Sequence, residues 1–398
     1  MLLDKLPKHI AEPQTTSPGE SKPLSDVIAT ALDQPLDYPA VNEWMFPGDS
    51  VVIVLQTNLP RPVEVVGVVL DYCQREGIEL DDVLLVVAPV MAKQFGISAK
   101  QLVQTEAEVA NGEPPTVLPV KIDSRSLNCQ VHDQSNTFGL AYLAANEAGD
   151  AVHVNRRLVD ADVVFPIGCP TSGNSAEGHD TIYPDFGSSA RAETFRDRSD
   201  SPDQRADEIK LANDNLSSFF SLQVVFSPGG EVSHALSGQR AQVIAAATQF
   251  ANQQWTVEPI PNADLVIATI EEPGREQTWS DFASSLTAAA RAAEGDAPIV
   301  VWSEIGQEPD PDTCQALQRQ FNESEASELS KELQALASIA AERPVFLHSN
   351  LPQSRIEDLG IGYINDEDDV YRIAAKATSG ICLRDAHRVN LKAPQTSQ

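Results

Sequence analysis

The sequence predicts an α/β protein made of two domains with mainly parallel sheets. Short apolar runs rich in β-branched residues alternate with segments of helical spacing, first over residues 24–255 and again over residues 263–385. The stretch Pro259-Ile260-Pro261 separates the two series. The 398 residues suffice for two domains of ordinary size, and a hydrophobic content of 42% suffices for a core in each.

The first series opens with strands and helices in strict alternation. Ser25 is a candidate cap for the first helix, Pro62 falls in the first turn of the second, and Gly77 stops that helix. Ser98 is the candidate cap of a third helix. In order, we predict a helix over 24–36, a strand over 50–56, a helix over 61–77, a strand over 81–90 and a helix over 98–111. This order is typical of a parallel, doubly wound sheet.

The second half of this series is less regular. Residues 151–168 predict a short strand, a helical turn and another buried strand, whereas residues 191–207 are very polar and are expected at the surface. Residues 217–238 alternate around Pro228-Gly229-Gly230, which is typical of a hairpin. A helix over 239–255 ends the series.

The second series predicts a second α/β domain. Its expected strands are residues 263–271, 297–305, 344–350, 361–366 and 380–385, and helices over 280–295 and 323–343 separate them. The predicted organisation is therefore an extended N-terminal arm (1–23), a first domain (24–254), a second domain (255–383) and a C-terminal tail (384–398). A return of this tail to the first domain is one open arrangement.

The charge balance excludes whole classes of partner. With 28 Lys and Arg against 58 Asp and Glu, the formal net charge is -30, which opposes binding to nucleic acid or to an anionic membrane surface. No segment approaches the ~20 apolar residues of a membrane span, and the N-terminus lacks the apolar stretch of a signal peptide. The five cysteines form no CxxC pair, as suits reduced thiols in a cytoplasmic protein. A solvated surface and adaptation to salt both explain the acidity.

Familiar cofactor and catalytic motifs are absent. The sequence contains no GxxxxGK[ST], no GxGxxG after the first strand, no HExxH, no GxSxG and no EF-hand loop. No two of its seven histidines lie within four residues, so no helical metal-binding pair exists. A phosphate, dinucleotide or zinc enzyme of a common type is therefore not predicted.

The segment VVFPIGCPTSGNSAEGHDTIYP (163–184) is the first candidate site. Its apolar strand stops at Gly168, and loops at the carboxyl ends of such strands are where open α/β sheets bind ligands. His179 beside Asp180 is the candidate catalytic pair, and a plain surface position is the alternative for this histidine. The candidate ligand-binding residues of the loop are Ser172, Gly173, Asn174 and Ser175.

The turn after the first strand is the second candidate site. Thr57, Asn58 and Arg61 lie between this strand and a helix whose N-terminus carries partial positive charge. The Arg61 guanidinium has the geometry to hold an anion with two donors. The alternative is a salt bridge between Arg61 and a carboxylate of this acidic chain, and the residues favour neither.

Several segments, in the same order, resemble the LarA-like family of nickel-dependent lactate racemases. FPGDSVVIVLQTNLPRPVEVV is similar to the family's opening, and VHDQ…LAYLAANEAGDAVHVNRRLVDADVVFPIG is the most specific match. The resemblance implies two α/β domains that face each other across a cleft. It also implies a nickel-pincer nucleotide bound covalently through a loop lysine, with a histidine on the nickel. Members are isomerases that racemise or epimerise 2-hydroxy acids by hydride transfer.

This sequence departs from the family at the residues that carry that chemistry. Arg61 matches the arginine that faces the cofactor phosphate, but Asp180 falls on the cofactor lysine. The family's other functional positions correspond here to Asn58, Pro60, Met91, Pro170, Ser199, Ser280, Asp281 and Ser284. Because the attachment lysine and the nickel histidine are missing, no nickel-pincer cofactor and no metal are expected.

The sequence thus favours a divergent lactate-racemase-like protein that has lost nickel-pincer chemistry. Its expected partner is a small anionic molecule in the interdomain cleft, namely a hydroxy acid, a sugar acid or a phosphorylated compound. One alternative is an active 2-hydroxy-acid racemase or epimerase with an altered cofactor site. The other is a non-catalytic structural or interaction protein whose cleft is filled by side chains. The substrate, the oligomeric state and the presence of any activity stay open at this point.

Overall fold

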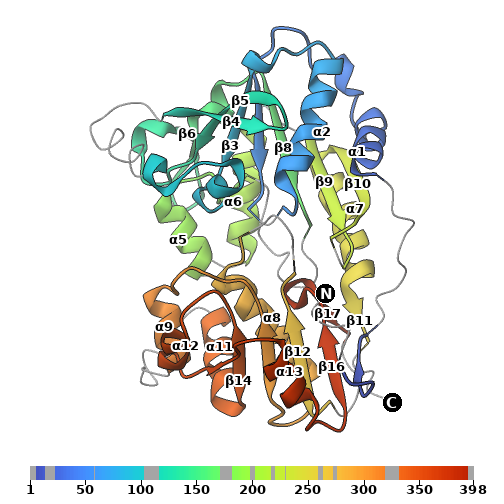
Figure 1. Cartoon of the computed structure of the whole chain (residues 1–398). Helices are drawn as coiled ribbons and strands as arrows, with labels where there is room; N and C mark the ends of the chain where they lie inside the picture. Colours follow the sequence, from blue (N-terminus) through green and yellow to red (C-terminus); the bar gives the residue numbers. More distant parts are fainter. Residues whose placement is uncertain are drawn as a thin grey trace.

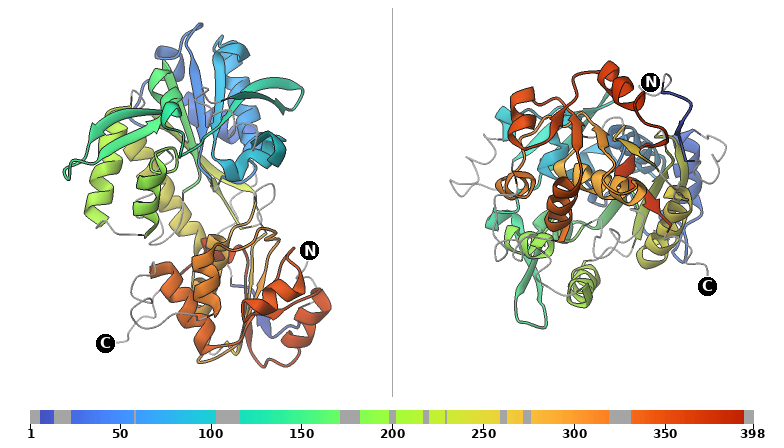
Figure 2. Two further views of the ribbon diagram at one scale, coloured as in Figure 1. Left: turned by 90° about the vertical axis from the view of Figure 1, so that its left-hand side faces the viewer. Right: turned by 90° about the horizontal axis from the view of Figure 1, so that it is seen from below.

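The computed structural model describes residues 6–13, 23–57, 59–102, 116–170, 182–197, 202–216, 220–228, 230–258, 263–271, 276–318 and 331–392. Within these ranges the chain forms two mainly parallel sheets, each in a lobe of its own (Figure 1). The left view of Figure 2 shows the first lobe, blue to yellow, above the orange and red second lobe. The predicted α/β class with mainly parallel sheets is therefore confirmed.

The first sheet has seven strands in the order β10-β9-β8-β2-β3-β5-β4. Its five inner strands are parallel, and the two edge strands, β10 and β4, run antiparallel to their neighbours. The inner strands are β2 (Val51–Leu55), β3 (Val83–Val87), β5 (Arg125–Val131), β8 (Val163–Gly168) and β9 (Phe220–Phe226). The edge strands are β4 (Val117–Ile122) and β10 (Val232–Gln239).

Both faces of the first sheet are covered, because alternate residues of its central strand are buried on opposite sides. Val51, Ile53 and Leu55 pack with helices α1 (Leu24–Asp33) and α2 (Pro62–Arg75). Val52 and Val54 pack on the other face with α5 (Ser189–Asp197) and α6 (Pro202–Asp214). Helix α7 (Arg240–Trp255) packs against β9 and β10.

A two-stranded hairpin interrupts the first lobe between β5 and β8. It consists of β6 (Leu140–Ala145) and β7 (Ala151–Asn155), and the short helix α4 (Arg156–Asp160) follows it. The right view of Figure 2 shows this green hairpin projecting from the body of the molecule. Shorter 3-10 turns are η1 (Val41–Glu43), η2 (Leu80–Asp82), η3 (Pro89–Phe95) and η4 (Thr137–Gly139).

The second sheet is wholly parallel, in the order β1-β16-β12-β13-β14-β15. Its strands are β1 (Ile10–Ala11), β12 (Leu265–Thr269), β13 (Ile299–Trp302), β14 (Val345–His348), β15 (Gly362–Tyr363) and β16 (Gly380–Leu383). The helices of this lobe are α8 (Trp279–Ala292), α9 (Pro311–Gln318), α11 (Lys331–Glu342), α12 (Gln353–Asp358) and α13 (Glu367–Ala374). Two cores lie on its opposite faces, one under α8, α9, α11 and α12 and the other under α13.

The two ends of the chain tie the lobes together. From the N-terminal arm, β1 adds to the edge of the second sheet beside β16. Near the C-terminus, η6 (Ala386–Arg388) leads into β17 (Asn390–Leu391), which pairs with β11 (Thr256–Val257) directly after α7. Arg388 Nη1 also donates to the Cys169 sulfur at 3.1 Å, and Cys169 directly follows β8 of the first sheet. The residue limits of the two domains remain a prediction.

Most predicted elements are found, although strands β4, β5 and β6 were not predicted and the helices show three differences. Pro23, not Ser25, stands at the N-cap of α1, and the Ser25 hydroxyl donates to Asp26 instead. The polar stretch 191–207 contains much of α5 and the start of α6, helices that its scarcity of apolar residues did not indicate. Ser98 and Gln101 cap each other at a helical first turn, while residues 103–111 of that predicted helix lie outside the described residues. The hairpin of β9 and β10 is confirmed.

Candidate functional site

The strand order of the first sheet reverses between β2 and β8. From β2 the chain continues to β3 and β5 on one side, and it then returns to place β8 and β9 on the other. Open α/β sheets bind ligands outside the carboxyl ends of the strands at such a point. Thr57 follows β2 there, and Cys169 follows β8. The strand end of the predicted loop 163–184 therefore lies where ligands of this fold class bind.

Gly168, the last residue of β8, leaves room for the side chains of Gln56 and Gln223 at this point. A Cβ on Gly168 would lie 2.5 Å from the side-chain oxygen of Gln56 and 2.6 Å from the side-chain nitrogen of Gln223. Gln56 Oε1 also accepts the backbone N–H of Cys169 at 3.1 Å. The ends of β2 and β8 are thus held together by a side chain, and the open space lies further along the sheet.

A cavity of about 510 Å³ opens at the carboxyl ends of β2, β3 and β5. Its other wall is the segment 185–189 before and at the start of α5. Its polar lining consists of hydroxyls, carboxylates, one amide and one imidazole, from Thr57, His132, Asp133, Gln134, Ser135, Asp185 and Ser189. Among the described residues that line this strand-end cavity there is no lysine or arginine. The lining is therefore acidic and rich in hydrogen-bonding groups.

Hydrogen bonds fix the two loops that carry these groups. Asp133 Oδ1 accepts the backbone N–H of Ser135 at 2.9 Å and its hydroxyl at 2.6 Å. Gln134 Nε2 donates to the backbone oxygen of Asp185 at 3.0 Å, and Ser189 N–H donates to the backbone oxygen of Gln134 at 3.0 Å. Thr57 Oγ1 lies 3.5 Å from Asp185 Oδ2, at the outer limit of a hydrogen bond. A ligand hydroxyl between Thr57 and Asp185 would find both a donor and an acceptor.

His132 holds the cavity wall through both of its ring nitrogens. Its Nε2–H donates to the backbone oxygen of Gly187 at 3.0 Å, and its Nδ1 accepts from Asn155 Nδ2 at 3.1 Å. The ring is 1% exposed, and this burial lowers the pKa of His132 to about 4. Because both nitrogens are engaged and the ring is neutral at pH 7, its role is to fix the position of the segment 185–189.

The depressed pKa of His132 predicts a pH-dependent stability. The His132 ring binds a proton only near pH 4 in the folded state, but near pH 6.5 in the unfolded chain. The contribution of His132 to the free energy of unfolding is therefore complete above pH 6.5 and is lost as the pH falls to about 4. The total loss is about 3 kcal/mol. Urea unfolding of the protein and of His132→Gln at pH steps from 7.5 to 4 (about half a unit apart) checks this. The variant should be less stable at pH 7 but should lack this part of the slope; parallel profiles would contradict the assignment.

Arg61 adopts the salt bridge that was the alternative to anion binding. It stands at the N-cap of α2 in a left-handed conformation with φ 50°. Its Nε donates to Glu64 Oε1 at 3.1 Å and its Nη2 to Glu64 Oε2 at 2.5 Å, and these bonds raise the pKa of Arg61. The side chain remains 25% exposed, so an anion at this position would share or replace Glu64. The role of Arg61 in anion binding stays a prediction.

The central part of the predicted loop lies outside the described residues. This holds for the candidate pair His179 and Asp180, and for Ser172, Gly173, Asn174 and Ser175. Asn58 of the turn after β2 also lies outside them. Of the predicted site residues, Thr57 lines the strand-end cavity, and Arg61 is placed four residues further along.

Two positions that depart from the LarA-like pattern have structural roles. Met91, on η3, is fully buried in the core, so its side chain faces hydrophobic residues. Asp281 caps helix α8, where its carboxylate accepts the backbone N–H of Thr278 at 2.7 Å and its hydroxyl at 2.8 Å. Neither side chain is available for a ligand in this arrangement.

The second sheet has its own reversal of strand order, between β12 and β16, and charged side chains occupy it. Arg384 Nη2 donates to Glu12 at 3.1 Å, and its Nη1 lies 3.6 Å from Glu271. Asp385 is 3% exposed in a left-handed conformation and accepts the backbone N–H of Glu271 at 2.8 Å. The N-terminal arm thus contributes Glu12 to a charged cluster at this second reversal.

The two sheets and the strand-end cavity define an open-sheet α/β protein with a cavity beside its topological switch point. Among solved structures, the chain is similar to the lactate racemase apoprotein from Thermoanaerobacterium thermosaccharolyticum, with a TM-score of 0.64 and 16% identity over 98% of this chain and 97% of that one. It is also similar to a crystal structure of a Thermotoga maritima protein, with a TM-score of 0.62 and 13% identity over 93% and 97%. The chain therefore has a lactate-racemase-like, or LarA-like, fold.

Sequence comparisons add no closer assignment: no protein-family model and no curated protein matches the chain. Across the described residues, no group of three or more His, Cys, Asp and Glu side chains is arranged to hold a metal ion. In the same part of the chain, no helix combines the length and apolarity that crossing a membrane requires. None of the five cysteines, all of which lie in the described residues, forms a disulfide.

Proposed function

We propose that the protein binds a small, hydroxyl-bearing organic molecule in the strand-end cavity of the first sheet. One observation carries this proposal: Thr57 and Asp185 converge from two sides on a 510 Å³ space beside the switch point. Carboxylates accept strongly from ligand hydroxyls, and Ser135 and Ser189 add further hydroxyl groups to the same wall. The volume suits a small organic molecule.

The charge of the cavity orients the proposed ligand. Asp133 and Asp185 repel a bound carboxylate or phosphate, and residues 171–181 contain no lysine or arginine that would offset them. We therefore propose that the hydroxyl end of a hydroxy acid, sugar acid or phosphorylated compound faces Asp185. Its anionic end is directed towards Arg61, at the N-terminus of α2, where it replaces Glu64 as the partner of the guanidinium.

We further propose that the protein does not use nickel-pincer chemistry. The residues do not fit the cofactor: the segment 163–184 contains no lysine for the covalent link, and Met91 is buried in the core. The one histidine that lines the strand-end cavity among the described residues, His132, has both ring nitrogens engaged. A 2-hydroxy-acid racemase or epimerase with an altered cofactor site therefore has less support than ligand binding.

The alternative of a purely structural protein also has less support. Its expected sign is a cleft filled by side chains. At the second sheet, the Glu12–Arg384–Glu271 cluster places charged side chains at the reversal of strand order. The first sheet instead keeps an open cavity at its strand ends. This difference between the two switch points favours binding at the first sheet.

A ligand panel tests the proposal. We expect at least one of a set of hydroxy acids, sugar acids, sugar phosphates and neutral polyols to raise the unfolding temperature in a saturable manner. Asp185→Asn, which keeps the shape of the side chain but removes its charge, should weaken that ligand about tenfold. Thr57→Val should weaken it to a similar extent because one hydrogen bond is lost.

The control is Asp160→Asn, an exposed carboxylate on α4 away from the strand-end cavity, which should leave the affinity unchanged. No shift across the whole panel would reject ligand binding and support the structural alternative. Stoichiometric nickel in protein produced together with the cofactor-making enzymes, with a matching adduct in the intact mass, would reject the loss of nickel-pincer chemistry.

A further inference from the structure

The β6–β7 hairpin has an edge that no other strand covers. In the described part of the chain, its two strands form a sheet of their own, and an isolated bridge joins Val154 of β7 to Gly187. Strand β6 therefore keeps an edge without a neighbouring strand. Such an edge can pair with another chain, and a two-stranded hairpin, which is only marginally stable alone, gains from a partner.

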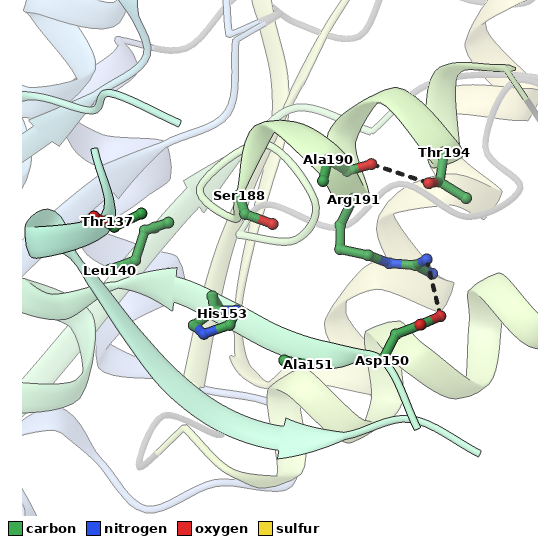
Figure 3. Close-up of a pocket in the computed structure, with 9 residues that line it drawn as sticks. All are labelled: Thr137, Leu140, Asp150, Ala151, His153, Ser188, Ala190, Arg191 and Thr194. Carbon is green, nitrogen blue, oxygen red and sulfur yellow. Dashed lines mark hydrogen bonds and ion pairs between the residues drawn. The ribbon is translucent and has the colours of Figure 1, made fainter. Parts of the chain in front are cut away.

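The inner side of the hairpin faces a space within the first lobe. A second cavity, of about 450 Å³, lies between the hairpin and the start of α5, and Figure 3 shows His153 and Arg191 on its two sides. Ser188 also lines this cavity, whereas Asp185 and Ser189 of the same segment line the strand-end cavity. The outer side of the hairpin is what remains for contact with another molecule.

The β6 region exposes aromatic side chains and carries no charge. Phe138 and Tyr142 are 62% and 60% exposed, the highest values among the large hydrophobic residues that the structure describes. Residues 134–146 contain no charged side chain, whereas at the overall 22% a stretch of this length would contain about three. Exposed apolar surface of this kind marks interaction sites. Because a net charge of -30 opposes the association of two copies, this is also the surface where they approach at least cost.

Two opposite charges flank β6, and neither has an ionic partner among the described residues. Arg156 is exposed, and its Nε and Nη2 donate to the backbone oxygens of Phe138 at 3.3 Å and Leu140 at 2.8 Å, which places the guanidinium at the start of β6. Glu147 is exposed in the turn that follows the end of β6. The β6 edge therefore has a positive charge at its start and a negative charge at its end.

We propose that the β6 edge is a self-association surface, through which two copies of this chain pair in antiparallel orientation. The two-fold axis passes Tyr142, so that this ring packs on Tyr142 of the second copy at the centre of the contact. The same axis brings Glu147 of each copy against Arg156 of the other, and because the contact is isologous this ion pair forms twice. A parallel arrangement would instead place like charges together at both ends.

Sedimentation equilibrium of the whole protein, at about 1–200 µM, tests this proposal. We expect the mass to rise reversibly with concentration from that of one chain towards that of two, since a hairpin contact is smaller than a standard interface. Tyr142→Lys, which places two like charges at the axis, should weaken the association about tenfold or more. Glu147→Lys should weaken it about tenfold, because the new ammonium faces Arg156 of the second copy, although the net charge becomes less negative.

The matched controls lie elsewhere in the first lobe and make the same changes of charge. Phe46→Lys alters a side chain that is 53% exposed, and Glu43→Lys alters an exposed carboxylate of η1. Neither should weaken the association, and urea unfolding should show that all four variants fold. Under mild oxidation, Tyr142→Cys should form a disulfide-linked dimer, whereas Phe46→Cys should not.

A mass of one chain over the whole concentration range would overturn the proposal. A dimer that neither Tyr142→Lys nor Glu147→Lys weakens would overturn it as well, because the contact would then lie on another surface. So would a dimer that the controls at Phe46 and Glu43 weaken to the same extent.

Discussion

Gly238→Ala is expected to destabilise the protein by about 3 kcal/mol or more. Gly238 has φ +129°, and a Cβ there would lie closer than 3.0 Å to the backbone nitrogen, carbon and oxygen of Leu36. These backbone atoms cannot move away easily, because Leu36 hydrogen-bonds to Ser237 and Gln239 on both sides of the glycine. Urea unfolding measures the change.

Gly149→Ala is the matched control for the backbone conformation. Gly149 has φ +88°, but a Cβ there would meet nothing within 4 Å. It should therefore show only the cost of a left-handed alanine, about 1–2 kcal/mol. Equal destabilisation by the two substitutions would contradict the close contact between the backbone of Leu36, which follows α1, and Gly238 of β10.

Glu208→Ala is expected to destabilise the first lobe by about 3–5 kcal/mol. Glu208 is 3% exposed and accepts from Arg191, from the Tyr183 hydroxyl at 2.5 Å and from Asn146 at 2.8 Å. Burial, and then the hydrogen bond to Glu208, raise the pKa of Tyr183. Removing the carboxylate leaves the guanidinium and the phenol buried without their main partner, which is the costly case for an ion pair.

The control lies on the same helix, where Asp214 pairs with Lys210 at the surface of α6. Asp214→Ala should leave the urea midpoint unchanged, because an exposed ion pair contributes little. Glu208→Gln should lie between the two, since it keeps the hydrogen-bonding shape but loses the charge. A loss in Glu208→Ala no greater than in Asp214→Ala would contradict the buried network.

The regular parts of the fold were predictable because their sequence pattern has a direct physical cause. Strands β2, β3, β8, β12 and β13 are buried on both faces and therefore read as continuous apolar runs. Strand β5 carries polar residues on its exposed face, and its weaker pattern did not predict a strand. Strand β6 was not predicted either, whereas the short strand predicted from residue 151 is found as β7. Helices α5 and α6 were missed because few apolar residues mark their buried side.

The candidate site was predictable only in part, for a related reason. Thr57 and the loop after β8 follow recognisable strands, so their place at the carboxyl edge could be inferred. Asp133 and His132 follow the unpredicted strand β5, and Asp185 stands in an irregular segment before α5. No local pattern shows that these side chains meet Thr57, because the contact joins segments far apart in the chain.

By itself, the sequence determined the α/β class, the order of the main strands along the chain and the lack of a cofactor lysine in the loop 163–184. These follow from local periodicity and residue identity. Only the tertiary structure decided that Arg61 pairs with Glu64, that His132 is a fixed neutral wall residue and that one segment separates two cavities. Such properties depend on burial and on contacts between distant residues, and neither is encoded in the spacing of neighbours along the chain.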